Sequence, residues 1–209
     1  MRGVKPMEKL ESEVKFLLAD IRSLRRKILD LGARSQGRFL EQNLRFEDTN
    51  NSLKDRKCLL RLRHDQKSTL TFKSPPPEDS RQVKVLKELE VEISDFATMR
   101  RILESIGFHC QQVYEKWRET FTFKNALFCL DTMPYGNFLE IEGAEKHIKQ
   151  YARRLGLPWD GRILGNYLEI FDIIRKELDL KFTDVTFDNF KDIDVPIQNY
   201  LHLMAAGPC

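Results

Sequence analysis

The chain has 209 residues, enough for one domain with a large core or for two small domains. Its 35 Lys and Arg residues against 32 Asp and Glu give a net charge of +3, and without a dense basic tail this near balance does not suggest nucleic-acid binding. No apolar run would span a membrane, residues 1–30 lack the apolar core of a signal peptide, and the four cysteines lack Cys-x-x-Cys spacing. We therefore expect a cytoplasmic protein with free thiols, and neither a disulfide nor a zinc site.

Alternating runs of residues predict eight strands, and helical segments lie between and after them. The strands are expected at 11–16, 39–47, 59–63, 69–73, 88–93, 113–123, 127–131 and 138–142. Helices with one apolar stripe are expected at 20–31, 94–106, 145–155 and 166–178. The strands and the first two helices form two halves of the order β-α-β-β-β, at about 7–73 and 84–143, joined by a proline-rich link at 74–80.

The two halves and the helices at 144–178 are grouped as one domain, residues 1–178. Residues 179–209 are expected to be a C-terminal extension of the same domain, irregular over 179–195. A short helix at 197–204 would either cover an open edge of the sheet or pair with a second copy in a homodimer.

Each predicted strand carries charge on one face and apolar side chains on the other. In the first strand, Glu11, Glu13 and Lys15 share one face, and Val14 and Phe16 share the opposite face. For a single strand the charged face usually points to water. Taken together, however, the apolar helix stripes need an apolar sheet face to cover, and three Glu-x-Glu pairs need neighbouring cations. The set predicts an α+β fold in which about eight strands close into a barrel with a charged interior and helices packed outside.

The interior predicted by strand parity carries both signs of charge. The acids are Glu11, Glu13, Glu88, Glu90, Glu92, Asp131, Glu140 and Glu142. The bases are Lys15, Arg61, Arg63, Lys73, Lys84, Lys116 and Arg118. Buried charges need partners, and clustered Arg and Lys suit a ligand with several phosphate groups. Clustered carboxylates suit Mg²⁺ or Mn²⁺, so the pattern indicates a metal–triphosphate complex, unless the charges only pair with each other.

At this point the sequence resembles the CYTH superfamily, the triphosphate tunnel metalloenzymes. The stretch 11–15, Glu-Ser-Glu-Val-Lys, is similar to the family's N-terminal Glu-x-Glu-x-Lys signature. The later family elements follow in order at 61–63, 71–73, 88–92, 116–118, 131 and 136–143. The resemblance covers about 7–178, and 166–171 resembles the end of the class IV adenylate cyclase branch. Asn43 and Arg45 depart from it, since relatives often carry Asp and Tyr there.

The resemblance implies an eight-stranded antiparallel closed barrel, a tunnel with helices outside, in which bases bind the triphosphate and acids hold divalent metal ions. The implied phosphate ligands are Lys15, Arg61, Arg63, Lys73, Lys116 and Arg118, to which parity adds Lys84. The implied metal ligands are Glu11, Glu13, Glu140 and Glu142, with Asp131 and Glu90. Glu13 or Glu90 would accept the proton of an attacking water, with Mg²⁺ or Mn²⁺ as the cofactor.

Three functions are compatible with this pattern. The first choice is a triphosphatase acting on tripolyphosphate or on a nucleoside or thiamine triphosphate. The second is a class IV adenylate cyclase that converts ATP to cyclic AMP and pyrophosphate. The third is a polyphosphate-binding module without catalysis, which the number of carboxylates argues against because binding an anion does not need them.

Overall fold

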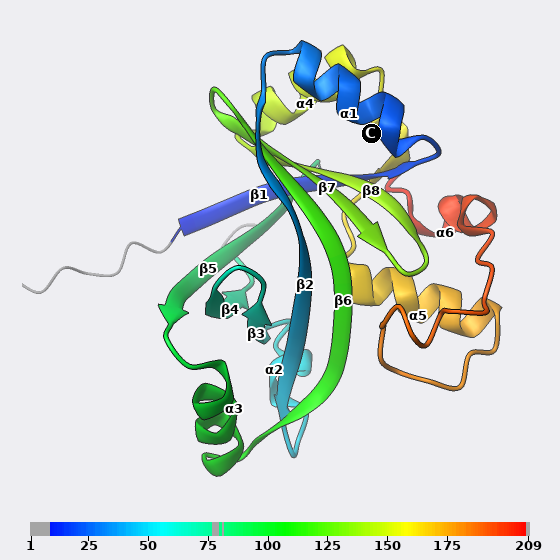
Figure 1. Ribbon diagram of the computed structural model, residues 1–209. Coiled ribbons are helices and arrows are strands. Elements are labelled where there is room, and N and C mark those ends of the chain that lie inside the picture. Colours follow the sequence, from blue (N-terminus) through cyan, green and yellow to red (C-terminus); the bar gives the residue numbers. More distant parts are fainter. Residues whose placement is uncertain (1–8, 77–79, 81, 208–209) are drawn as a thin grey trace, which may run out of the picture.

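The computed structural model describes residues 9–76, 80 and 82–207. One antiparallel sheet closes on itself, because its strands run in the order β5-β4-β3-β2-β6-β7-β8-β1 and β1 also pairs with β5 (Figure 1). The eight strands of the ring are β1 (Lys9–Leu18), β2 (Arg34–Asp48), β3 (Leu59–His64), β4 (Ser68–Ser74), β5 (Lys84–Ile93), β6 (Phe108–Phe123), β7 (Ala126–Met133) and β8 (Gly136–Gly143). The predicted fold class is confirmed. A two-residue strand that the sequence did not predict, β9 (Arg162–Ile163), pairs with β1 beyond the end of its pairing with β5.

Helices cover the outside of the ring. They are α1 (Ile21–Asp30), α2 (Ser52–Asp55), α3 (Phe96–Ser105), α4 (Glu145–Leu155), α5 (Tyr167–Glu177) and α6 (Leu201–Met204), with short 3₁₀ turns at Trp159–Gly161 and Ile197–Tyr200. Helices α1 and α4 lie together at one end of Figure 1, α2 and α3 lie at the other end, and α5 lies at the side. None of the described helices is long and apolar enough to cross a membrane.

Apolar side chains lie between the helices and the outer face of the ring. Val14 and Phe16 of β1 are buried there with Leu24 and Ile28 of α1 and Ile148 of α4. This arrangement reverses the usual one of an open sheet, because the charged faces of the same strands point inward. Burial of the apolar face thus stabilises the ring and fixes which side chains enter its interior.

The outer face is not covered everywhere. Ile102 and Ile106, which the predicted stripe of the second helix included, are 47% and 65% exposed, because α3 buries only Leu103 fully. Leu89 and Val91 on β5 are 42% and 55% exposed. The pattern predicted the apolar faces correctly but overestimated how much of them the helices reach.

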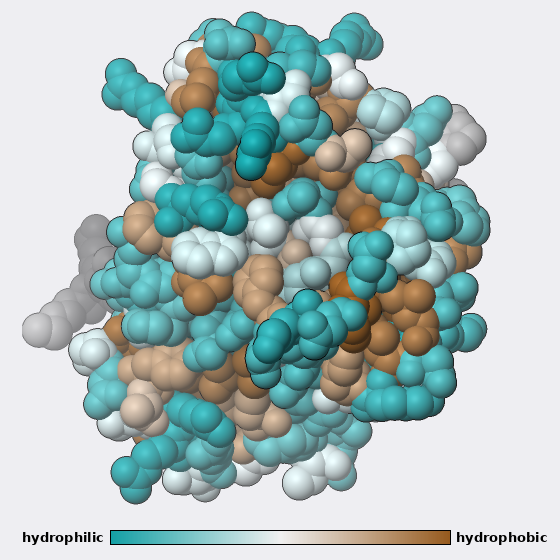
Figure 2. Space-filling model, turned by 45° about the vertical axis from the view of Figure 1, so that its right-hand side comes forward, coloured by the Kyte–Doolittle hydropathy of each residue, from teal (hydrophilic) through white to brown (hydrophobic). Residues whose placement is uncertain are grey.

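The C-terminal segment completes the fold. Strand β7 pairs with β6 only from Trp117 onward, and Val185 continues the ladder alongside Val113 and Glu115 of β6. Ile197 and Met204 are buried with the apolar face of α5. Figure 2 shows this side of the molecule, where hydrophobic patches lie between hydrophilic side chains. Val185 therefore covers an edge of β6, whereas residues 197–204, for which either an edge-covering or a pairing role was expected, pack against α5.

Candidate metal and phosphate site inside the ring

Strand β1 places the first three charged residues of the site. Alternation along the strand turns Glu11, Glu13 and Lys15 inward, while the buried outer residues hold the register. The Lys15 ammonium lies 2.6 Å from Glu13 Oε1 and 3.1 Å from Glu140 Oε1, and its side chain is only 3% exposed. Burial by itself lowers the pKa of Lys15, but the two carboxylates raise it above its ordinary value. Lys15 is therefore a fixed positive charge of the interior.

Asp131 on β7 is the most fully bonded acid of the interior. Its Oδ1 accepts a hydrogen bond from Arg118 Nε at 2.7 Å, and its Oδ2 accepts bonds from Lys116 Nζ at 3.0 Å and Tyr167 Oη at 2.7 Å. The side chain is 0% exposed. Because its oxygens already have donors, Asp131 in this state orients the two bases.

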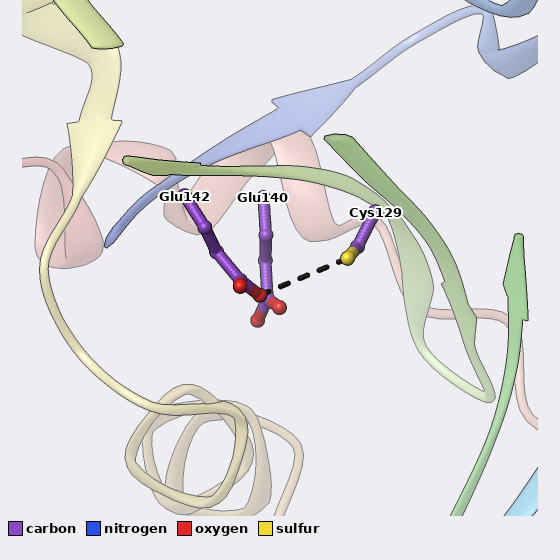
Figure 3. Close-up of side chains that lie close together, drawn as sticks. All are labelled: Cys129, Glu140 and Glu142. Atoms are coloured by element: carbon purple, nitrogen blue, oxygen red, sulfur yellow. Dashed lines mark hydrogen bonds between the residues drawn. The ribbon is translucent and has the colours of Figure 1, made fainter. Parts of the chain in front are cut away.

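Three carboxylates lie close together at one end of the ring. Oxygens of Glu11, Glu13 and Glu142 are all within 4.8 Å of one another, and Glu142 also belongs to a second group with Glu140 and Cys129. Figure 3 shows the three side chains of the second group pointing toward each other from β7 and β8, with Cys129 Sγ donating to Glu142 Oε1 at 3.7 Å. Neither group includes Asp131 or Glu90.

Glu142 differs from the other interior carboxylates. Within the described ranges, no Lys or Arg lies at ion-pair distance from Glu142, whereas Lys15, Lys84, Arg118 and Lys73 lie at that distance from its carboxylate neighbours. Burial raises the pKa of Glu142, and although Arg118 lowers it, Glu140 and Glu13 raise it further. A cation at this position would supply the missing partner.

The other two members of the carboxylate group titrate in opposite directions. Burial raises the pKa of Glu11 to about 7 against the opposing effect of Lys73. Burial also raises the pKa of Glu13, but Lys15 and Lys84 outweigh it, and the resulting pKa is about 2. At neutral pH Glu13 is therefore a weak proton acceptor and a ready metal ligand.

A second wall of the interior is formed by β3, β4 and β5. Arg63 lies 3.3 Å from Glu90 Oε2 and 3.7 Å from Glu41 Oε1. Arg61 donates to Tyr114 Oη and Thr71 Oγ1 at 3.4 and 3.3 Å. Glu90, which accepts from Thr71 at 2.8 Å, is a third exposed. Glu90 thus lies with the arginines and outside the two carboxylate groups.

Two lysines connect β4 and β5 to the carboxylates of β1. Lys73 contacts Glu11 and lies 2.8 Å from Glu88 Oε2. Lys84 lies 3.3 Å from Glu13 Oε1. Burial lowers the pKa of Lys84, with a further lowering by Lys15, although Glu13 opposes both. All seven predicted bases therefore face the interior, but Glu92 does not belong there, since its side chain is 62% exposed and pairs with Lys67.

The sequence argument missed three polar residues of the interior. Glu41 is 3% exposed and lies within 4 Å of Lys116, Arg118 and Arg63. The sequence could have predicted that Glu41 faces the interior, because Glu41 and Asn43 are two residues apart on one strand and share a face. The same alternation could have predicted that Tyr114, which pairs with Asn43, faces the interior. No pattern in the sequence predicts that Tyr167 faces the interior, since it enters from the first turn of α5. The centroid of its ring lies 5.3 Å from Lys15 Nζ and 5.0 Å from Lys116 Nζ.

The carboxylate group borders a pocket at the surface. The pocket has a volume of about 410 Å³. Its lining residues are Leu10, Glu11, Ser12, Asn125, Ala126, Leu127, Glu142, Gly143 and Ala144. Glu11 and Glu142 therefore border this pocket, and its other lining residues are uncharged.

Comparison with known proteins assigns a family to this arrangement. A model of the CYTH domain matches residues 9–155. The PH1012 protein from Pyrococcus horikoshii OT3 is 31% identical with a TM-score of 0.66, over 76% of this chain and 98% of that chain. No curated protein matches the chain.

Two further solved structures share the fold at lower identity. A Vibrio parahaemolyticus protein described as a "putative adenylate cyclase" is 16% identical with a TM-score of 0.71, over 79% of this chain and 99% of that chain. The Hippeastrum protein HpAC1, described as an adenylyl cyclase candidate that reveals a dominant triphosphatase activity, is 19% identical with a TM-score of 0.57, over 78% and 95% of the two chains.

Proposed function

The chain belongs to the CYTH family, and from that premise we propose that it is a triphosphatase that depends on a divalent metal ion. The observation that carries the proposal is the group of Glu11, Glu13 and Glu142, in which Glu142 lacks a basic partner within the described part of the chain. A metal ion on this group completes the pairing of a buried charge. The neighbouring bases are then free to pair with phosphate oxygens.

The fit of Mg²⁺ or Mn²⁺ rests on the chemistry of these side chains. Carboxylate oxygens are the ligands that both ions prefer, and Glu11, Glu13 and Glu142, with Glu140 beside them, would hold the ion. When bound, the ion supplies charge to stabilise the phosphoryl group and acidity to activate a water. Cys129 is a softer ligand that these ions do not require.

The bases of the ring would bind and orient the triphosphate. Lys15, Lys116 and Arg118 lie on the wall that also holds Asp131, and Arg61 and Arg63 lie on the β3 wall. In the unliganded protein these bases are paired with carboxylates, so binding exchanges carboxylate partners for phosphate partners. The interior remains neutralised throughout, which keeps the cost of burying the substrate's charge low.

Hydrolysis requires a proton acceptor for the attacking water. Water attacks the terminal phosphorus, and the bond from that phosphorus to the bridging oxygen breaks. The products are orthophosphate and the shorter polyphosphate, which is the leaving group. Of the two predicted acceptors, Glu13 has a pKa of about 2 and is better suited to hold the metal. We therefore assign the role of proton acceptor to Glu90. Its side chain is a third exposed and lies between Arg63 and Thr71.

A second candidate is conversion of ATP to cyclic AMP and pyrophosphate. The sequence of Asn166 to Phe171 at the start of α5, which resembles the cyclase branch, favours it. The two reactions differ in the nucleophile, in the phosphorus that is attacked and in the need for a pocket that holds the base. The Hippeastrum description, which pairs a cyclase name with triphosphatase activity, is a reason to place hydrolysis first.

Phosphorus NMR of the purified protein with ATP or tripolyphosphate, and with Mg²⁺ or Mn²⁺, tests the proposal. Orthophosphate release that disappears with a chelator supports a metal-dependent triphosphatase. Cyclic AMP with pyrophosphate would establish the cyclase instead, and binding without any product would favour the binding module. Lys116→Ala and Arg118→Ala should raise KM, whereas Lys149→Ala, on the exposed face of α4, serves as the matched control.

A further inference from the structure

Several polar atoms of the interior have no hydrogen-bond partner within the described part of the chain. Asn43 on β2 is 0% exposed, and both its amide nitrogen and its amide oxygen lack a partner. The hydroxyl of Thr69 and Nε of Arg61 also lack a hydrogen-bond partner among the described residues. Thr69 is 2% exposed. Buried polar groups are nearly always satisfied, so a set of orphaned ones indicates that something else completes them.

These residues are neighbours across three strands. Asn43 pairs in register with Arg63 of β3, and Arg63 pairs in turn with Thr69 of β4. On its other side Asn43 pairs with Tyr114 of β6. Since adjacent strands lie about 4.8 Å apart, Asn43 and Thr69 are about 10 Å apart with Arg63 between them. The orphaned atoms therefore flank a proposed phosphate ligand.

The donor and acceptor types of this set limit the ligand. An ionised phosphate offers only acceptors, so it can satisfy the donors of Arg61, Thr69 and the Asn43 amide nitrogen, but not the Asn43 amide oxygen. That oxygen needs a donor from the ligand, such as a hydroxyl or an N–H group. A purely inorganic polyphosphate lacks such a group, whereas the sugar or base of a nucleoside has it next to the phosphates.

We propose that Asn43 and Thr69 form a specificity subsite, on either side of Arg63, for a hydroxyl- or amide-bearing organic group of the substrate. The subsite rests on the proposed binding of a triphosphate in the ring, and it selects a nucleoside triphosphate over tripolyphosphate. Asn43 suits such a group, since an amide provides donor and acceptor in one side chain. Binding would satisfy atoms that are unsatisfied in the free protein.

The test compares two probes that are not hydrolysed, by isothermal titration calorimetry in the presence of Mg²⁺. One probe is the β,γ-methylene analogue of ATP, and the other is bis(methylene)triphosphonate, its counterpart without a nucleoside. Their bridging groups carry no N–H that could donate to the Asn43 amide oxygen. The wild type should bind the nucleotide more tightly. Asn43→Leu and Thr69→Val, which keep side-chain volume, should each reduce the ratio of nucleotide to inorganic affinity by about tenfold. Asn137→Leu, on the outward-facing side of β8, should leave the ratio unchanged.

A thermal melt without ligand gives an independent readout. Because its amide is unsatisfied, Asn43→Leu should raise the Tm of the free protein, whereas an Asn with hidden internal partners would give a lower Tm and overturn the subsite. An unchanged affinity ratio in both variants, or tighter binding of bis(methylene)triphosphonate by the wild type, would also overturn it while leaving triphosphate binding intact. Failure of the wild type to bind either probe would instead refute the proposed function, and the subsite with it.

Discussion

Glu140 and Glu142 lie two residues apart on β8, and we predict that removing their charges has opposite effects on the metal-free protein. Glu140 lies 3.1 Å from Lys15 and contacts Arg118, and its side chain is 5% exposed. Burial raises its pKa, but Arg118, Lys15 and Lys116 together hold it well below the ordinary range. Glu140→Gln removes one of two carboxylate partners from Lys15 and from Arg118, which keep Glu13 and Asp131, and should cost about 1.5–3 kcal/mol of unfolding free energy.

Glu142→Gln removes a charge that has no base at ion-pair distance among the described residues. The pKa of Glu142 is raised, first by burial, so the charged form is disfavoured in the folded protein. The variant should therefore be as stable as the wild type, or more stable, when metal is absent. Its amide oxygen can still accept the weak bond from Cys129.

Urea unfolding in the presence of a chelator, and again with excess Mn²⁺, measures both effects. At one hundred times Kd, bound metal should stabilise the wild type by about 2.7 kcal/mol, and Glu142→Gln should lose most of this gain. Glu145→Gln, which breaks an exposed pair with Lys149 on α4, is the control and should change stability by less than about 1 kcal/mol. Equal destabilisation by Glu140→Gln and Glu142→Gln would refute the reasoning, because it would mean that Glu142 has internal partners.

Three further predictions concern residues around the site. Burial raises the pKa of Glu41, but Lys116 and Arg118 outweigh it and lower the pKa from 4.5 to about 2, so its stabilising contribution is present above pH 4.5 and is lost as the pH falls toward 2. Between pH 4.5 and pH 2 the unfolding free energy of Glu41→Gln should therefore fall by about 3 kcal/mol less than that of the wild type, as measured by urea titration. An equal fall in both proteins would contradict the lowered pKa of Glu41. Tyr167→Phe removes the 2.7 Å hydrogen bond to Asp131 and should cost about 1.5–3 kcal/mol by the same method, while a neutral result would mean that the hydroxyl does not orient Asp131. Asn166→Ala removes the capping box of α5 and should cost about 1 kcal/mol in a thermal melt followed by circular dichroism, with Asn166→Asp as a control that keeps the cap and should remain close to the wild type.

Much of the fold could be predicted because it depends on local alternation. A period of two separates Glu13 and Lys15 from Val14 and Phe16 whatever the rest of the chain does. The apolar residues then need helices outside, and the charged ones need one another inside. The same argument placed all seven bases in the interior, and it would have placed Glu41 and Tyr114 there if it had been applied to every strand.

The sequence by itself therefore determined the charged face of most strands, their closure into a ring and the charged character of its interior, because each follows from side-chain parity and from the cost of burying unpaired charge. Only the tertiary structure decided which charges meet. Lys15 pairs with Glu140 across 125 positions of sequence, and Glu142 is left without a base, through the stagger of β1 against β8. Tyr167 reaches Lys15 because helix α5 packs against Tyr114 and Phe138 of the ring, and no periodicity within the helix specifies where its first turn will dock.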